Sequence, residues 1–83
     1  MTREEALQII KDEKLQYYNW FAEHEKRANE VAIIHNNGKW SVFTTDEREC
    51  VISEVKYDSE SDALKDFIER LRASKMLREL GYY

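Results

Sequence analysis

Few side chains in this 83-residue sequence are of the types that perform catalysis or bind metal ions. Histidine occurs twice, as His24 and His35, and Cys50 is the one cysteine. A cysteine nucleophile needs a histidine beside it, and a zinc site needs several such ligands at short spacings. Neither spacing is present here, and a pairing of His24 with a carboxylate such as Glu54 would depend on the fold. The sequence therefore predicts a protein without enzymatic activity, metal or cofactor.

These residues have simpler structural interpretations. His35 is expected to pack beside Trp40 on a neighbouring strand, and Cys50 is expected to be an inert, partly buried thiol at a strand start. Gly38 belongs to a turn rather than to a phosphate-binding loop. A single cysteine allows no disulfide within the chain, whereas small secreted domains usually carry several. We therefore expect a cytoplasmic protein.

Carboxylates are the groups that the sequence offers in excess. There are 17 acidic residues against 13 Lys and Arg, which gives a net charge of -4. Nucleic-acid binding rests on clustered basic residues, so the composition argues against it. The segment 46–62 holds seven of the acids and two basic residues: Asp46, Glu47, Glu49, Glu54, Asp58, Glu60 and Asp62, with Arg48 and Lys56. This segment is either a solvated face beside a helix N-terminus or a surface that attracts a basic partner protein.

Aromatic residues are the second unusual group. Tyr17, Tyr18, Trp20 and Phe21 lie within five positions. On a strand they must alternate between faces, so either Tyr18 and Trp20 or Tyr17 and Phe21 point away from the helices. One pair fills the core, and the other is exposed or contacts a partner. Tyr17 and Trp20 are accordingly candidate contact residues.

The elements that must position these groups begin with a helix from about Arg3 to Lys14. Thr2 and Glu5 have the spacing of a capping box, in which each side chain binds the backbone N–H of the other residue. A strand is expected within 15–25, where the aromatic residues favour extended backbone. The helix is expected to bury Ala6, Leu7 and Ile10, with Ile9 at the margin.

The clearest local pattern is a hairpin. Segments 31–36 and 39–45 are strand-like and are separated by Asn37-Gly38, which suits a two-residue type I′ turn. That turn fixes the register, with the pairs Asn36–Lys39, His35–Trp40, Ile33–Val42 and Val31–Thr44. The opposite face carries Ala32, Ile34, Ser41, Phe43 and Thr45. Helices can cover only one face, so the other, including Phe43, is a candidate contact surface.

A polar turn at 46–49 leads to a fourth strand, Cys50 to Tyr57, which is expected to have one solvent-exposed face. Ser59 caps a second helix that ends near Gly81. Its buried stripe is Leu64, Phe67, Ile68 and Leu71, which Met76, Leu77 and Leu80 continue. We predict one domain over residues 1–83, of the α+β class. It consists of an N-terminal helix, a four-stranded antiparallel β-meander and a C-terminal helix, with both helices on one face of the sheet.

Four segments, taken in order, resemble a bacterial family of small immunity proteins, immunity protein 59. They are Leu15-Gln16-Tyr17-Tyr18, Gly38-Lys39-Trp40-Ser41-Val42, Thr44-Thr45-Asp46-Glu47-Arg48, and Ser61-Asp62-Ala63-Leu64 leading into Phe67-Ile68-Glu69-Arg70-Leu71-Arg72. The resemblance implies an inhibitor that binds a cognate toxin domain in the producing cell and blocks it by occlusion. It implies no catalytic residues and no cofactor.

Combined with the charge pattern, the resemblance gives a set of candidate toxin contacts: Asp46, Glu47, Glu49, Glu54, Tyr17, Trp20 and Phe43. Arg48 is interpreted as a structural residue that ties the turn to a neighbouring carboxylate. Neither nucleic acid nor a membrane is an expected partner, and the chain is expected to be a monomer or weak homodimer. Two alternatives stay open: a phage-type inhibitor that mimics nucleic acid, and a homodimeric interaction module that pairs through the second sheet face.

Overall fold

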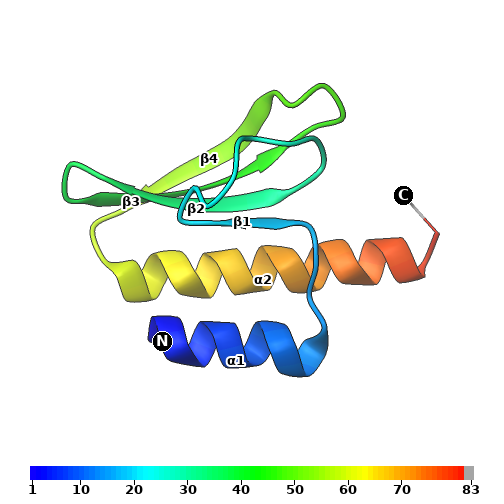
Figure 1. The fold of residues 1–83 in the computed structure, drawn as a ribbon, viewed down its shortest axis with the longest axis horizontal. Coiled ribbons are helices and arrows are strands. Elements are labelled where there is room, and N and C mark those ends of the chain that lie inside the picture. The colour runs from blue at the N-terminus through cyan, green and yellow to red at the C-terminus, as the bar shows by residue number, and fades with distance from the viewer. Residues whose placement is uncertain (82–83) are drawn as a thin grey trace.

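The computed structural model describes residues 1–81, which form two helices and one four-stranded sheet. In chain order the elements are α1 (Arg3–Glu13), β1 (Tyr18–Trp20), β2 (Val31–Asn36), β3 (Lys39–Thr45), β4 (Val51–Tyr57) and α2 (Glu60–Glu79). The α+β class and this order agree with the prediction. In Figure 1, α2 lies beneath the sheet and α1 lies beneath α2. Contacts to the sheet come mainly from α2, which packs against β2 and β3 and to a lesser extent against β4.

Both helices begin at the predicted caps. Thr2 and Glu5 form the capping box of α1, and the Ser59 hydroxyl accepts a hydrogen bond from the Asp62 N–H. The core side of α1 consists of Ala6 and Ile10 with the partly buried Ile9, whereas Leu7 is exposed. The prediction for Leu7 is therefore wrong, because α1 packs against α2 along a narrow contact that Ile9 rather than Leu7 reaches.

The first strand differs from its prediction in length and direction. β1 has three residues and runs parallel to β2, so the sheet is mixed and not an all-antiparallel meander. Tyr17, Phe21 and Ala22 have φ angles of 62°, 50° and 57°, which end the extended backbone on both sides. Since β1 has only three residues, the loop from Phe21 to Glu30 is long enough to return along it. β2 therefore starts beside Tyr18, the first residue of β1, and runs in the same direction.

The predicted hairpin is confirmed in bounds and register. β2 and β3 pair Asn36 with Lys39, His35 with Trp40, Ile33 with Val42 and Val31 with Thr44. The His35 and Trp40 rings are stacked with centroids 4.3 Å apart, as expected. Ile33 and Val42 face α2 and join the core around Phe67. The same face holds Tyr18 and Trp20, whose rings pack against Phe67, so this pair points toward the helices.

A bulge in β4 overturns the predicted alternation of that strand. Val42 pairs with Val55 and Thr44 pairs with Ile52, so Ser53 and Glu54 together oppose the single residue Phe43. Ser53 has a φ of 55°, which suits a bulge position. The extra residue moves Ile52 onto the helix-facing side with Val55 and leaves Val51 on the other. Both faces of β4 are largely exposed, contrary to the expectation of one buried face.

Candidate functional site

The turn between β3 and β4 is shaped by Asp46. Its carboxylate accepts hydrogen bonds from the backbone N–H groups of Arg48 (2.8 Å) and Cys50 (2.9 Å). The Asp46 carboxylate, which was predicted to contact a toxin, therefore stabilises the turn. Arg48 is tied to the Asp46 carboxylate through its backbone N–H, and within residues 1–81 its guanidinium group makes no ion pair. Cys50 is exposed just before β4, so the expectation of a partly buried thiol is wrong.

Thr45 holds the same turn to the loop that precedes β2. Its hydroxyl accepts a hydrogen bond from the Glu30 N–H (3.0 Å) and donates one to the Arg27 carbonyl (2.5 Å). The buried Glu30 carboxylate in turn contacts the His24 ring at 2.9 Å and the Arg27 N–H at 3.0 Å. His24 thus pairs with Glu30 and not with Glu54. These contacts fix the loop and the β3–β4 turn side by side.

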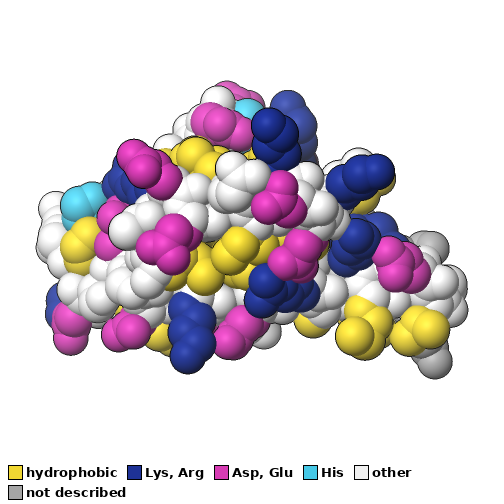
Figure 2. Space-filling view, turned by 90° about the horizontal axis from the view of Figure 1, so that it is seen from below, with side chains coloured by type: hydrophobic (Ala, Val, Ile, Leu, Met, Phe, Trp, Pro, Cys, Tyr) yellow, Lys and Arg dark blue, Asp and Glu magenta, His cyan; other side chains and the backbone are white. Residues whose placement is uncertain are grey.

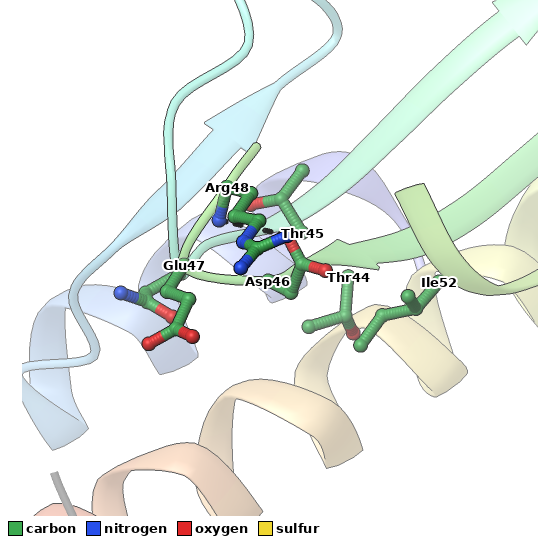
Figure 3. A pocket seen from close by; sticks show the side chains of 7 residues that line it. Thr44, Thr45, Asp46, Glu47, Arg48 and Ile52 are labelled. Atoms are coloured by element: carbon green, nitrogen blue, oxygen red, sulfur yellow. Dashed lines mark hydrogen bonds between the residues drawn. The ribbon is translucent and has the colours of Figure 1, made fainter. Parts of the chain in front are cut away.

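An open pocket of about 740 Å³ lies against the turn and is lined by Asn29, Thr44, Thr45, Asp46, Glu47, Arg48 and Ile52. Figure 3 shows Glu47 at one end of it and Ile52 at the other. Arg70 of α2 reaches the Thr44 hydroxyl at 3.3 Å, so α2 lies close to the pocket. Asn29, Thr44 and Ile52 were not predicted as site residues. The bulge that places Ile52 here has no clear sequence pattern.

Ion pairs neutralise part of the acidic segment. Asp58 pairs with Lys39, and Glu60 pairs with Arg3 at 2.6 Å and accepts a hydrogen bond from the Trp40 ring nitrogen. Among the described residues, Glu47, Glu49 and Glu54 have no ion-pair partner. Asp62, at the start of α2, is also exposed and has no ion pair within residues 1–81. The negative charge of the segment that remains available to a partner therefore lies on the β3–β4 turn, on the bulge of β4 and at the start of α2.

The aromatic candidates differ in accessibility. Tyr17 is 57% exposed, and the Arg78 guanidinium lies over its ring at 4.3 Å. Trp20 is half-buried against Phe67 and Phe21. Phe43 is only 9% exposed, although it lies on the sheet face that was expected to be open. Ala32, Ser41 and Thr45 on that face are buried as well. Tyr17 is thus the one aromatic candidate whose ring is largely accessible.

The strand register places Tyr17 and the β3–β4 turn at the same end of the molecule. One row across the sheet consists of Tyr18, Val31, Thr44 and Ile52. Tyr17 comes directly before this row in the chain, and the β3–β4 turn connects Thr44 to Ile52 beyond the same end of the strands. α2 ends beside Tyr17, as Arg78 shows, so its last turns lie at this end too.

The last turns of α2 are apolar and exposed. Met76, Leu77 and Leu80 were predicted to continue the buried stripe, but the helix continues past the sheet and leaves them in solvent. Figure 2 shows hydrophobic side chains gathered on this projecting end. We use the name turn-end surface for this end of the molecule, where Tyr17, Glu47 and Glu49 are exposed near the β3–β4 turn and Met76, Leu77 and Leu80 are exposed at the end of α2. Exposed apolar side chains are candidates for the centre of a protein contact, and acids without ion pairs suit its polar rim.

Within residues 1–81, no three His, Cys, Asp or Glu side chains are grouped as metal ligands. Neither helix in this range is both long and apolar enough to cross a membrane. Residues 1–81 thus form a small α+β fold, and the turn-end surface is its candidate protein-binding surface.

A family model for immunity protein 59 matches residues 2–79, and the chain belongs to this family. The match covers α1, the whole sheet and α2. No curated protein and no solved structure matches the chain.

Proposed function

We propose that this protein binds a cognate bacterial toxin domain and neutralises it by occlusion inside the cell that produces both. The observation that carries the proposal is the family match over residues 2–79. Inhibition by binding needs neither catalytic residues nor a cofactor. A protein that meets its toxin before export would act in the cytoplasm.

The turn-end surface is the proposed toxin contact. Glu47 and Glu49 are exposed on the β3–β4 turn, where they would attract a basic toxin and accelerate its association. Tyr17, Met76 and Leu80 supply exposed apolar area at the same end of the molecule, and its burial would slow dissociation once water is excluded. Asp46 would act indirectly, by holding the turn in shape.

The test is a titration of the purified chain against the toxin domain encoded beside it, by calorimetry together with rescue of growth. The expected result is a complex of nanomolar affinity or tighter, worth roughly 12 kcal/mol or more. The Glu47→Lys/Glu49→Lys variant should associate at least tenfold more slowly at low salt, while its rate of dissociation changes little. Glu69→Lys, on the solvent face of α2, is the matched control for the single variants Glu47→Lys and Glu49→Lys, because each of the three makes the same charge change.

Two results would contradict the proposal in different ways. Absence of binding and rescue by the unmodified chain would reject the toxin-binding function itself. Tight binding with unchanged association of the Glu47→Lys/Glu49→Lys variant would retain the function and move the contact away from the turn.

A further inference from the structure

Within residues 1–81, the outer edge of β4 pairs with no other strand. β4 is the last strand in the order β1-β2-β3-β4, and it is seven residues long, against three for the other edge strand. An exposed strand edge offers N–H and C=O groups to any further strand. Ile52 and Val55 on its helix-facing side are 44% and 42% exposed, because α2 is centred under β2 and β3. This edge therefore combines free backbone groups with apolar side chains.

The backbone groups that point outward are identified by the hydrogen bonds of β3. The Thr45 N–H binds the Glu30 carbonyl on the β2 side, and the Asp46 N–H binds the Cys50 carbonyl on the β4 side. Alternate residues of β3 therefore face opposite neighbours, and Val42 faces its β4 partner Val55. It follows that the peptide groups of Glu54 and Lys56, on either side of Val55, point away from the sheet.

The side chains of these two residues make the edge complementary to itself. In an antiparallel pair, directly opposite side chains lie on the same face, so two copies of β4 can shift only in steps that keep the faces matched. If Val55 lies opposite its own copy, Glu54 lies opposite Lys56 of the second chain, and Lys56 lies opposite Glu54. A shift to either neighbouring register places Glu54 against Glu54 or Lys56 against Lys56. Of these three registers, the one centred on Val55 is the one free of like-charge contacts.

We propose that a second copy of this chain pairs with β4 in this register, forming a symmetric dimer with a continuous eight-stranded sheet. Glu54 and Lys56 exchange backbone hydrogen bonds and ion pairs with their counterparts. On the helix-facing side the two Val55 side chains meet, and the bulge brings Ile52 opposite Tyr57 of the other copy. This surface is distinct from the second sheet face considered from the sequence, where Phe43 is buried.

Charge exchange between two variants tests the register. Sedimentation equilibrium should show a concentration-dependent dimer for the unmodified chain at concentrations up to about 1 mM. Glu54→Lys or Lys56→Glu alone should weaken dimerisation roughly tenfold, since each creates two like-charge pairs. An equal mixture of the two variants should restore it, because every cross-strand pair in the mixed dimer is again attractive. Glu69→Lys is the control, and circular dichroism checks that each variant is folded.

A disulfide across the symmetry axis provides an independent measurement. In the proposed register the Val55 Cα atoms are about 4.5 Å apart, within the range that a disulfide spans. Val55→Cys in a Cys50→Ser background should form a covalent dimer on mild oxidation, and Leu7→Cys in the same background should not. A strictly monomeric chain at about 1 mM, or single variants that dimerise as well as the unmodified chain, would overturn the proposal. A mixture that does not restore dimerisation, or a Val55→Cys chain that crosslinks no better than its control, would overturn it too. None of these measurements involves a toxin, so the outcome is independent of the proposed function.

Discussion

Asp46, Glu47 and Glu49 are neighbours of the same charge, yet their carboxylates have different contacts. The Asp46 carboxylate accepts two backbone hydrogen bonds within the turn, whereas Glu47 and Glu49 have no ion-pair partner among the described residues. A carboxylate that satisfies backbone N–H groups stabilises a local conformation. The acidic residues of this turn therefore divide into one positioning residue and two residues available to a partner.

We expect Asp46→Ala to lower the free energy of unfolding by about 1–2 kcal/mol, because two N–H groups lose a charged acceptor. Glu47→Ala should change it by less than about 0.5 kcal/mol, as for other exposed substitutions. Urea denaturation of the two variants measures the difference. Equal stabilities would show that the Asp46 hydrogen bonds do not hold the turn.

Tyr57 connects β4 to α2 through its hydroxyl, which donates to the Asp66 carboxylate at 2.7 Å. This hydrogen bond, followed by burial and the negative charge of Asp66, raises the pKa of Tyr57 above its ordinary value. Since the folded pKa is raised, the stabilisation is fully present below the unfolded pKa and is lost as the pH rises through the folded pKa. In an absorbance titration at alkaline pH, Tyr57→Phe should remove a late-titrating tyrosine. Loss of an early-titrating one instead would contradict the assignment.

The two ends of α2 differ although both carry apolar residues at helical spacing. Leu64, Phe67, Ile68 and Leu71 are buried beneath the sheet, whereas Met76, Leu77 and Leu80 extend past it. Helical periodicity indicates which residues share a face, but not how far the neighbouring sheet extends. The physical limit on the core is therefore the extent of the sheet along α2 and not the length of the apolar stripe.

Substitutions in the two halves of α2 should separate these roles. Phe67→Ala should destabilise the fold by about 3–5 kcal/mol, because its ring packs among Tyr18, Trp20 and the β2–β3 core. Leu77→Ala should cost less than about 0.5 kcal/mol. Chemical denaturation compares the two variants. A large loss for Leu77→Ala would mean that the end of α2 is covered in solution.

The Asn37-Gly38 turn requires left-handed backbone at both of its central residues. Gly38 has a φ of 75°, and a Cβ added there meets nothing within 4 Å. We expect Gly38→Ala to lower the free energy of unfolding by about 1–2 kcal/mol through the left-handed backbone conformation, without a steric clash. Thermal unfolding measures this change. Asn37→Gly is the comparison, since it keeps the type I′ turn and should be close to neutral.

At the scale of the whole molecule, the net charge of -4 and the exposed acids of the turn-end surface predict salt-dependent association with a basic toxin. The Debye length falls from about 30 Å at 0.01 M salt to about 8 Å at 0.15 M, so the association rate should fall steeply over this range. Stopped-flow measurements at several salt concentrations provide the test. The Glu47→Lys/Glu49→Lys variant should show a shallower dependence, and an identical slope would exclude steering by the turn.

Local patterns in the sequence determined much of this protein. The capping box at Thr2, the Ser59 cap, the Asn37-Gly38 hairpin with its register, and the buried stripe around Phe67 all depend on residues close in the chain. The resemblance to the immunity protein 59 family, likewise taken from sequence segments, agrees with the family match. These features were predictable because their hydrogen bonds and helical faces are set within a few residues.

Only the tertiary structure decided the rest. The parallel direction of β1, the bulge at Ser53, the burial of Phe43 and the exposure of the end of α2 each depend on which segments meet across the sheet. The same holds for the candidate site, where ion pairs with Arg3 and Lys39 neutralise some acids and leave Glu47 and Glu49 available. Such contacts join residues far apart in the chain, so no local spacing encodes them, and packing decides which side chains stay exposed.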